Sequence, residues 1–352
     1  MSFRLLVRFY ILSLDRGEGK GVYCEGNVVF LEVGMPGWFW GILGAVLGVL
    51  FLVLLVAFIC FMKVFYSPRR KVEEEDEYDI PPGDEYVPFH EMMVNWIRLA
   101  RSMPREAVEI TSFDGTTLRG YYYEHHKGAP VEILFHGYRG NGERDLSGGI
   151  ERCFCLGRSA LIVDHRGNGR SDGHVITFGV RERRDCLCWI DFAIRRFGED
   201  VKLILGGVSM GAATVVMASG EPLPPQVKCI MADCGYSSQK DMICKVIREM
   251  HLPYKLLYPF VKLGARLFGG FNLEEVTPVS ALEKCTVPMI FIHGTGDAFV
   301  PHEMSQILYD ACPTKKSLVF IDDAAHGTAY PHDKARYVSA LKDFEMECGF
   351  LN

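Results

Sequence analysis

Two short segments of this 352-residue sequence have the form G-x-S-x-G, the pattern that surrounds the serine nucleophile of many hydrolases. One is GVSMG at residues 207–211, and the other is GRSDG at residues 169–173. A serine hydroxyl is a weak nucleophile at neutral pH, so it needs a base, and the base needs a third group that orients it. The residues around each serine must therefore decide between the two segments.

The surroundings of Ser209 favour the first segment. An apolar run, LILGG, precedes it and MGAATVVMA follows it, which predicts a strand, a sharp turn and a helix. Gly207 and Gly211 leave room for such a turn, and the N-terminus of the following helix favours a developing negative charge. Ser171 lies instead in the polar stretch HRGNGRSDGH, with no apolar helix directly after it. We therefore interpret Ser209 as the nucleophile and the second segment as a chance match.

A base and an acid for Ser209 follow later in the chain. His326 lies in FIDDAAHGTAY, just after the last predicted strand, and Asp297 lies in FIHGTGDAFVP, just after the preceding strand. Serine, aspartate, histidine is the chain order expected when the serine occupies a strand–turn–helix. Asp322 and Asp323 are nearer to His326 in sequence, but they fall within or at the end of a strand, and we interpret them as structural.

Acyl transfer also needs hydrogen-bond donors for the oxyanion. The backbone N–H of Met210, directly after the nucleophile, is one expected donor. The second is expected after the strand that ends in ILFHG, where the backbone N–H of Tyr138 follows a glycine. The phenol of Tyr138 would then line the pocket, the alternative being an ordinary surface aromatic. His136 and His293, each followed by glycine at a strand end, are interpreted as partners of local backbone groups.

Neither a metal nor a cofactor is expected. The pairs Cys153/Cys155 and Cys186/Cys188 are C-x-C rather than the C-x-x-C of zinc sites, and they fall in predicted helices. No H-E-x-x-H segment is present. The net charge of −6 and the lack of a basic stripe argue against a nucleic-acid partner.

The elements that must position these residues alternate between strand and helix. Two strands around a tight turn, residues 107–123, come first. Further strands are predicted at 131–137, 159–167, 201–209, 227–235, 287–297 and 316–327, with helices at 143–157, 180–198 and 210–220. Continuous apolar strands separated by helices predict an α/β fold, with a mostly parallel central sheet, helices on both faces and ligands at the carboxyl ends of the strands.

One stretch interrupts the alternation. Residues 239–286 contain no clear strand and include the apolar, basic segment MICKVIREMHLPYKLLYPFVKLGARLFGG. An insertion at this point of the chain would lie above the carboxyl ends of the strands. We interpret it as a helical lid over a pocket, with two additional surface helices as the alternative.

An uncharged apolar run at residues 38–62 predicts one transmembrane helix, because roughly 20 apolar residues suffice to cross a bilayer. Trp38 and Trp40 lie at one end, and the other end is followed by the basic residues Lys63, Arg69, Arg70 and Lys71. This asymmetry predicts a single-pass membrane protein with the rest of the chain on the cytoplasmic side. Ten of the twelve cysteines follow the span, which also suits a reducing compartment. The run is too long for a cleaved signal peptide.

The remaining segments complete the expected domain order. Residues 1–34 are of uncertain character, and translation beginning at Met35 would remove them. Residues 63–88 are expected to form a charged linker. Residues 71–88 of it are acidic and contain several prolines, and we interpret them as an exposed tether. The hydrolase domain is expected over residues 89–352. Its first helix, residues 89–103, would present one apolar face, formed by Met93, Trp96, Ile97 and Ala100.

The segments FHGYRGN, VDHRGNGRSDG, GVSMGAA, HGTGDAFVP and AHG resemble the α/β-hydrolase superfamily over residues 105–350. Within it, the chain is similar to a membrane-anchored bacterial branch related to serine aminopeptidases and prolyl-oligopeptidase-type domains. The resemblance implies serine hydrolase chemistry without a cofactor, but no particular substrate. The sequence lacks the HGGG motif of one lipase group, which argues against that group.

The interpretation we favour is a membrane-anchored serine hydrolase that cleaves a small-molecule ester or thioester through an acyl-enzyme. A serine peptidase acting on short peptides is the alternative. A non-catalytic binding protein on a hydrolase scaffold is a third, which an intact triad disfavours. The sequence does not predict an oligomeric state.

Overall fold

The computed structural model describes residues 3–11, 25–33, 36–68 and 78–349, and it divides into two compact units, residues 1–56 and 57–352. In the first unit, strand β1 (Phe3–Ile11) pairs antiparallel with β2 (Glu25–Val33). The sequence predicted no element before residue 38, so these strands are an addition. Met35, the expected alternative start, lies outside the described residues.

Helix α1 (Gly37–Val64) contains the whole of the predicted span. It is 28 residues long, and its most apolar window has a mean hydropathy of 3.2. By length and composition it can cross a membrane. Its last turns belong to the second unit, where Phe61 is almost fully buried.

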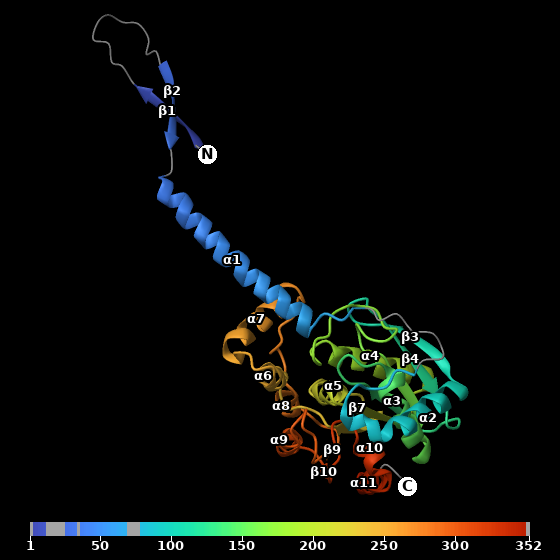
Figure 1. Ribbon diagram of the computed structural model, residues 1–352. Helices are drawn as coiled ribbons and strands as arrows, with labels where there is room; N and C mark the ends of the chain where they lie inside the picture. The colour runs from blue at the N-terminus through green and yellow to red at the C-terminus, as the bar shows by residue number, and fades with distance from the viewer. Residues whose placement is uncertain (1–2, 12–24, 34–35, 69–77, 350–352) are drawn as a thin grey trace, which may run out of the picture. The chain divides into compact units, whose positions relative to one another are not determined.

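The second unit contains an eight-stranded sheet with the order β10-β9-β8-β7-β5-β6-β4-β3 (Figure 1). The strands are β3 (Glu106–Thr111), β4 (Thr117–Tyr123), β5 (Val131–Phe135), β6 (Ser159–Val163), β7 (Leu203–Val208), β8 (Val227–Asp233), β9 (Met289–Gly294) and β10 (Lys316–Ile321). Strands β5 to β10 run parallel, whereas β3 and β4 are antiparallel at one edge. This arrangement confirms the predicted mostly parallel sheet.

Helices cover both faces of the sheet (Figure 1). They are α2 (His90–Ser102), α3 (Gly142–Cys155), α4 (Glu182–Phe197), α5 (Met210–Ala218), α9 (Glu303–Ala311), α10 (Ala329–His332) and α11 (Lys334–Glu347). Along β7, Leu203 and Leu205 share a core with α4, whereas Ile204 shares one with α11. This alternation explains why the strands are apolar throughout: successive side chains face opposite layers of helices. Helix α2 buries the predicted face, namely Met93, Trp96, Ile97 and Ala100.

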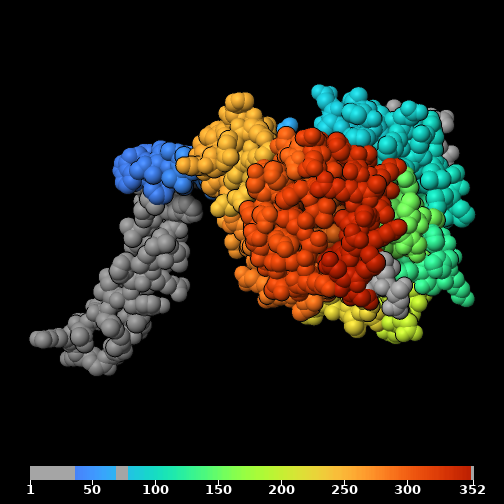
Figure 2. Space-filling model, turned by 90° about the horizontal axis from the view of Figure 1, so that it is seen from below, coloured from blue at the N-terminus to red at the C-terminus, as the bar shows by residue number. Residues whose placement is uncertain are grey.

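The predicted lid contains three helices, α6 (Gln239–Glu249), α7 (Tyr254–Leu267) and α8 (Pro278–Leu282). Figure 2 shows part of this insertion, in orange, projecting from the body of the second unit. One hydrophobic cluster joins the insertion to the end of α1 and to Met210, the residue after the predicted nucleophile. The insertion therefore packs beside the predicted site.

The segment expected to be a charged linker, residues 63–88, is packed at both ends; residues 69–77 lie outside the described part. Phe65 is fully buried, with its ring centroid 5.9 Å from that of Phe178 and 5.3 Å from that of Phe271. Tyr66 pairs with Val175, and residues Asp84–Phe89 form a 3₁₀ helix, η1. The expected linker was therefore too long, because its first aromatic residue, Phe65, inserts into the core of the second unit.

Candidate functional site

The predicted nucleophile occupies a strained turn between β7 and α5. Ser209 has φ +57° and ψ −115°, a conformation that non-glycine residues rarely adopt. A Cβ atom on Gly207 would lie 2.3 Å from the carbonyl carbon of Gly211, and one on Gly211 would lie 2.0 Å from the carbonyl oxygen of Phe135. Both glycines of GVSMG are therefore required by close backbone packing, as the pattern predicted.

The order of the sheet brings a second loop to this turn. The connections reverse direction between β5 and β7, and ligands in open α/β sheets bind where such a reversal occurs. Phe135 of β5 pairs with Gly207 of β7, so the residues that follow each strand lie side by side. A Cβ atom on Gly137 would lie only 3.6 Å from the Cβ of Ser209. The loop that carries Tyr138 thus borders the predicted nucleophile.

The three residues predicted to act together form one hydrogen-bonded chain. The Oγ of Ser209 lies 2.9 Å from Nε2 of His326, and Nδ1 of His326 lies 2.7 Å from Oδ2 of Asp297. The carboxylate accepts from Nδ1–H, which leaves Nε2 as the acceptor for the serine hydroxyl. This tautomer is the one that a general base for Ser209 requires.

The carboxylate of Asp297 is held by four donors. Its Oδ1 accepts the backbone N–H groups of Phe299 and Val300 at 2.9 and 2.8 Å. Its Oδ2 accepts from His326 and, at 3.1 Å, from Nε2 of His293. Burial alone would raise the pKa of Asp297, but the hydrogen bonds from the two imidazoles outweigh burial and hold this pKa well below its usual range. Asp297 is therefore ionised at neutral pH.

Both expected oxyanion donors lie beside Ser209. Within the described part of the chain, the backbone N–H groups of Tyr138 and Met210 bond no other protein group. The phenol of Tyr138 was expected to line the pocket, but it has partners elsewhere. Its hydroxyl donates to the carbonyl of Val64 at 2.7 Å, and its ring stacks on Phe178 at 5.0 Å. The phenol turns this way because Val64 ends helix α1 and its carbonyl has no partner within the helix.

Sequence reasoning did not assign three groups that surround the predicted triad. His293 bonds the Val300 carbonyl, as expected for a backbone partner, but it also bonds the Asp297 carboxylate. The ring of Phe299 contacts that of His326 edge to face, with centroids 5.1 Å apart. Tyr86, from the segment expected to be a linker, places its hydroxyl 3.5 Å from the position of a Cβ on Gly327. The four-residue spacing from His293 to Asp297 after a strand was the available signal for the first of these.

A cysteine adjoins the predicted triad. The sulfur of Cys234 lies with ligand atoms of Asp297 and His326, all within 4.8 Å of one another. Burial raises the pKa of this thiol well above its usual value, so the group is a neutral thiol at physiological pH. Asp297 and His326 are already hydrogen-bonded to each other at 2.7 Å, which is a proton contact rather than a separation that holds an ion.

The other candidates have structural partners. Ser171 donates to the carbonyl of Asp164 at 2.7 Å and accepts the N–H of Arg119 at 2.9 Å, so it stabilises a loop. Asp322 pairs with Arg336 at the surface. His136 donates from Nδ1 to the Gly137 carbonyl and accepts the N–H of His165 at Nε2.

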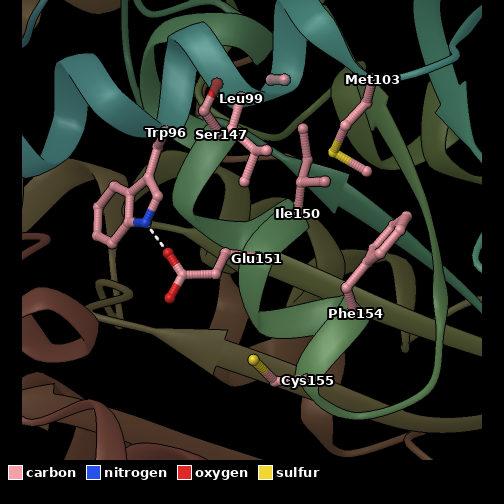
Figure 3. Close-up of a pocket in the computed structure, with 9 residues that line it drawn as sticks. Trp96, Leu99, Met103, Ser147, Ile150, Glu151, Phe154 and Cys155 are labelled. Atoms are coloured by element: carbon pink, nitrogen blue, oxygen red, sulfur yellow. Dashed lines mark hydrogen bonds between the residues drawn. The ribbon is translucent and has the colours of Figure 1, made fainter.

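A separate groove of about 410 Å³ lies between α2 and α3 (Figure 3). Its walls are mainly apolar and include Leu99, Met103 and Ile150. The indole N–H of Trp96 donates to Glu151 at one side, as the dashed line in Figure 3 shows. None of the triad residues lines this groove, so it is not part of the site around Ser209.

Part of the chain matches a known protein family. Residues 204–331, which include Ser209, Asp297 and His326, match the family model described as serine hydrolase (FSH1). The uncharacterized protein YqkD of Bacillus subtilis (strain 168) is 26% identical over 243 residues, covering 69% of this chain and 79% of its own. Two solved structures are similar. The esterase Pf2001 of Pyrococcus furiosus has a TM-score of 0.58 and 22% identity, over 77% of this chain and 97% of its own. The acylaminoacyl peptidase of Pyrococcus horikoshii has a TM-score of 0.50 and 16% identity, over 71% of this chain and 42% of its own.

Proposed function

Because the chain is a serine hydrolase of the α/β-hydrolase superfamily, we propose that Ser209, His326 and Asp297 are its catalytic triad. The observation that carries this proposal is the continuous chain of hydrogen bonds from the Ser209 hydroxyl through His326 to Asp297. We further propose that the enzyme cleaves esters or thioesters through an acyl-enzyme intermediate.

The proposed reaction uses each group in turn. The Oγ of Ser209 attacks the carbonyl carbon of the substrate while Nε2 of His326 accepts the hydroxyl proton. The ionised Asp297 stabilises the resulting imidazolium, and the N–H groups of Tyr138 and Met210 donate to the oxyanion. His326 then protonates the leaving alcohol or thiol. In the second half, His326 Nε2 takes a proton from a water molecule as its oxygen attacks the carbonyl carbon of the acyl-enzyme. The bond to Ser209 Oγ then breaks, His326 returns the proton to that oxygen, and the carboxylic acid is released.

The surroundings of the site favour an acyl group with apolar character. Met210 belongs to a hydrophobic cluster with Phe178 and with apolar side chains of α6 and α7. An apolar wall suits the acyl part of an ester or thioester, since apolar surface gains from leaving water. A peptidase acting on short peptides is the second candidate, because the fold is shared with an acylaminoacyl peptidase.

Membrane anchoring through α1 is also part of the proposal. The length and hydropathy of the helix support it, as do the tryptophans at one end and the basic residues after the other. This asymmetry supports a hydrolase unit on the cytoplasmic side. A cysteine reagent that cannot cross membranes, applied to cells that carry a new cysteine within residues 73–85, tests the orientation: labelling without lysis would contradict it.

A fluorophosphonate probe tests the nucleophile. We expect the wild-type protein and Ser171→Ala to be labelled and Ser209→Ala to remain unlabelled, with thermal unfolding used to confirm that each variant is folded. Labelling that survives in Ser209→Ala would overturn the assignment. A panel of acyl esters beside aminoacyl amides then separates the two substrate classes, and activity restricted to the amides would favour the peptidase.

A further inference from the structure

The lid carries exposed apolar side chains with basic residues among them. We call residues 250–268 the lid face. Its exposed apolar side chains are Met250, Leu252, Leu256, Leu267 and Phe268. Residues 250–268 include the basic residues Lys255, Lys262 and Arg266 and no acidic residue; Lys262 is paired with Glu274 outside this range. Several large exposed apolar side chains on one segment mark a candidate interaction site.

The lid face is attached to the end of α1. A Cβ atom on Gly264 of α7 would lie 2.5 Å from the carbonyl oxygen of Ala57, so the two helix backbones touch. The ring of Phe268 packs at 5.2 Å from that of Phe58 and at 5.9 Å from that of Phe61. Helix α7 is therefore held against the last two turns of α1.

The position of this contact along α1 places it at a membrane surface. If Trp40 marks one interface, roughly 20 helical residues bring the chain across the hydrocarbon core to about Cys60. Residues 57–61, which α7 contacts, then lie at the level of the opposite headgroups. Lys63, which follows them, belongs to the basic group expected on the cytoplasmic side.

We propose that the lid face docks into the headgroup region of the bilayer that α1 crosses, so that the Ser209 site receives acyl esters that reside in that membrane. This inference rests on the proposed membrane anchor and nucleophile. An amphipathic helix binds an interface through its apolar side chains, and lysine or arginine side chains near anionic lipids strengthen that binding. The lid face combines both features, and α1 already holds it at the bilayer.

The same elements border the catalytic residues. Val261 of α7 and Met242 of α6 share a hydrophobic cluster with Met210, the residue after Ser209. On the other side, the Tyr138 hydroxyl donates to the carbonyl of Val64 at the end of α1. A substrate whose acyl chain lies in the bilayer would therefore meet the lid and the loop that carries Tyr138 without first entering bulk water.

Photo-crosslinking tests the docking directly. Benzoylphenylalanine replaces Leu256 on the lid face or, as the matched control, Met346 on α11; the two side chains are 62% and 59% exposed. The full chain is reconstituted in vesicles of phosphatidylcholine and phosphatidylglycerol. We expect phospholipid adducts at position 256 and none at 346, measured by mass spectrometry. Equal adducts at both positions, none at 256, or crosslinks from 256 to a second copy of the chain would overturn the proposal.

Kinetics test the consequence for the substrate. The double variant Leu256→Glu/Leu267→Glu should hydrolyse a long-chain fluorogenic ester embedded in the vesicles about tenfold more slowly, because the acidic side chains resist insertion between anionic lipids. Hydrolysis of a soluble short-chain ester should be unchanged, and Met346→Glu should alter neither rate. Equal rates of wild type and double variant on the embedded ester would contradict membrane delivery.

The controls separate this inference from its premises. Failure of the wild-type chain to float with vesicles would contradict the membrane anchor. If Ser209→Ala were still labelled by the fluorophosphonate and only a variant of another serine lost the label, the assignment of Ser209 as nucleophile would be wrong. A chain that floats and is labelled at Ser209, yet gives no lipid adduct at position 256, contradicts the docking of the lid face alone.

Discussion

Asp297 is the most constrained side chain of the site. Two backbone N–H groups hold one carboxylate oxygen, and two imidazoles hold the other. A carboxylate with four donors cannot rotate without losing hydrogen bonds, so it fixes the orientation of His326 as well as its tautomer. His293 acts on His326 only through Asp297 and is therefore a positioning residue.

The charge of Asp297 can be removed with little change in shape. We expect Asp297→Asn to reduce kcat/KM for a soluble ester by about 10³–10⁴-fold, because the amide can no longer stabilise the imidazolium and favours the wrong tautomer of His326. Asp322→Asn, nearer to His326 in sequence, should leave activity unchanged because Asp322 pairs with Arg336. A loss of less than tenfold in the first variant, or a similar loss in both, would argue against Asp297 as the acid.

The low pKa of Asp297 also predicts how stability depends on pH. The folded-state pKa is lowered relative to the unfolded value of about 3.9, so the folded protein holds this proton less tightly. The resulting stabilisation is fully present above the unfolded pKa and is lost as the pH falls towards the folded one. Between about pH 5 and pH 3, the wild-type melting temperature in detergent should therefore decrease more than that of Asp297→Asn. If the melting temperatures of both proteins decreased equally over this pH range, Asp297 would not contribute to the pH dependence of stability.

At the level of elements, the sequence predicted those strands and loops that short, local sequence patterns identify. The strands at Ser209, Asp297 and His326 are apolar runs that end in glycine or polar residues, and the structure brings those three side chains together. Tyr86 was not predicted to approach the site, because nothing in DEYVPF distinguishes a packed 3₁₀ turn from an exposed linker. Its position depends on the fold around it.

The turn between β7 and α5 provides a steric test. We expect Gly211→Ala to abolish fluorophosphonate labelling, because its Cβ would lie 2.0 Å from the Phe135 carbonyl oxygen, and backbone atoms cannot yield. Gly149→Ala in α3 is the control. Its Cβ would meet the end of the flexible Leu134 side chain at 3.1 Å, so labelling should persist. Normal labelling of Gly211→Ala would show that the turn is looser than described.

A buried charge cluster links β5 to α3 and to the residues directly after α3. Glu132 is fully buried and bonds both Arg152 and Arg158, the latter at 2.7 Å. Burial would raise the pKa of Glu132, but the two guanidinium groups outweigh burial and lower it. We expect Glu132→Gln to reduce the free energy of unfolding by about 3–5 kcal/mol, because it leaves the buried Arg152 guanidinium without its carboxylate partner, whereas Arg158 still pairs with Glu345.

An exposed pair supplies the comparison for Glu132. Glu106 bonds Arg196 at the surface, and Glu106→Gln should cost at most about 1 kcal/mol. Denaturant unfolding in detergent measures both variants. Equal effects would mean that water reaches the buried pair.

For the whole chain, the boundary between helix α1 and the hydrolase unit is the feature that the sequence predicted least well. Charge and proline content indicated a linker at residues 63–88, and composition alone carries no information about packing partners. Phe65 is buried only because Phe178 and Phe271, more than 100 residues later, form a pocket for its ring. Likewise, the close contact between Gly264 and Ala57 depends on tertiary structure. The end of α1 is therefore part of the hydrolase unit.

Truncation of the chain within or after α1 tests whether the end of this helix is part of the fold or is only attached to it. A chain that begins at residue 78 lacks Phe61 and Phe65, and their loss removes roughly 3–6 kcal/mol of apolar burial. It also removes the Val64 carbonyl that binds the Tyr138 hydroxyl. We expect this chain to melt at a lower temperature and to hydrolyse a soluble ester more slowly than a chain that begins at residue 57, which keeps these contacts. If the two truncated chains had the same melting temperature and activity, α1 would be only a tether. Its position beside the loop that carries Tyr138 would then have no consequence for catalysis.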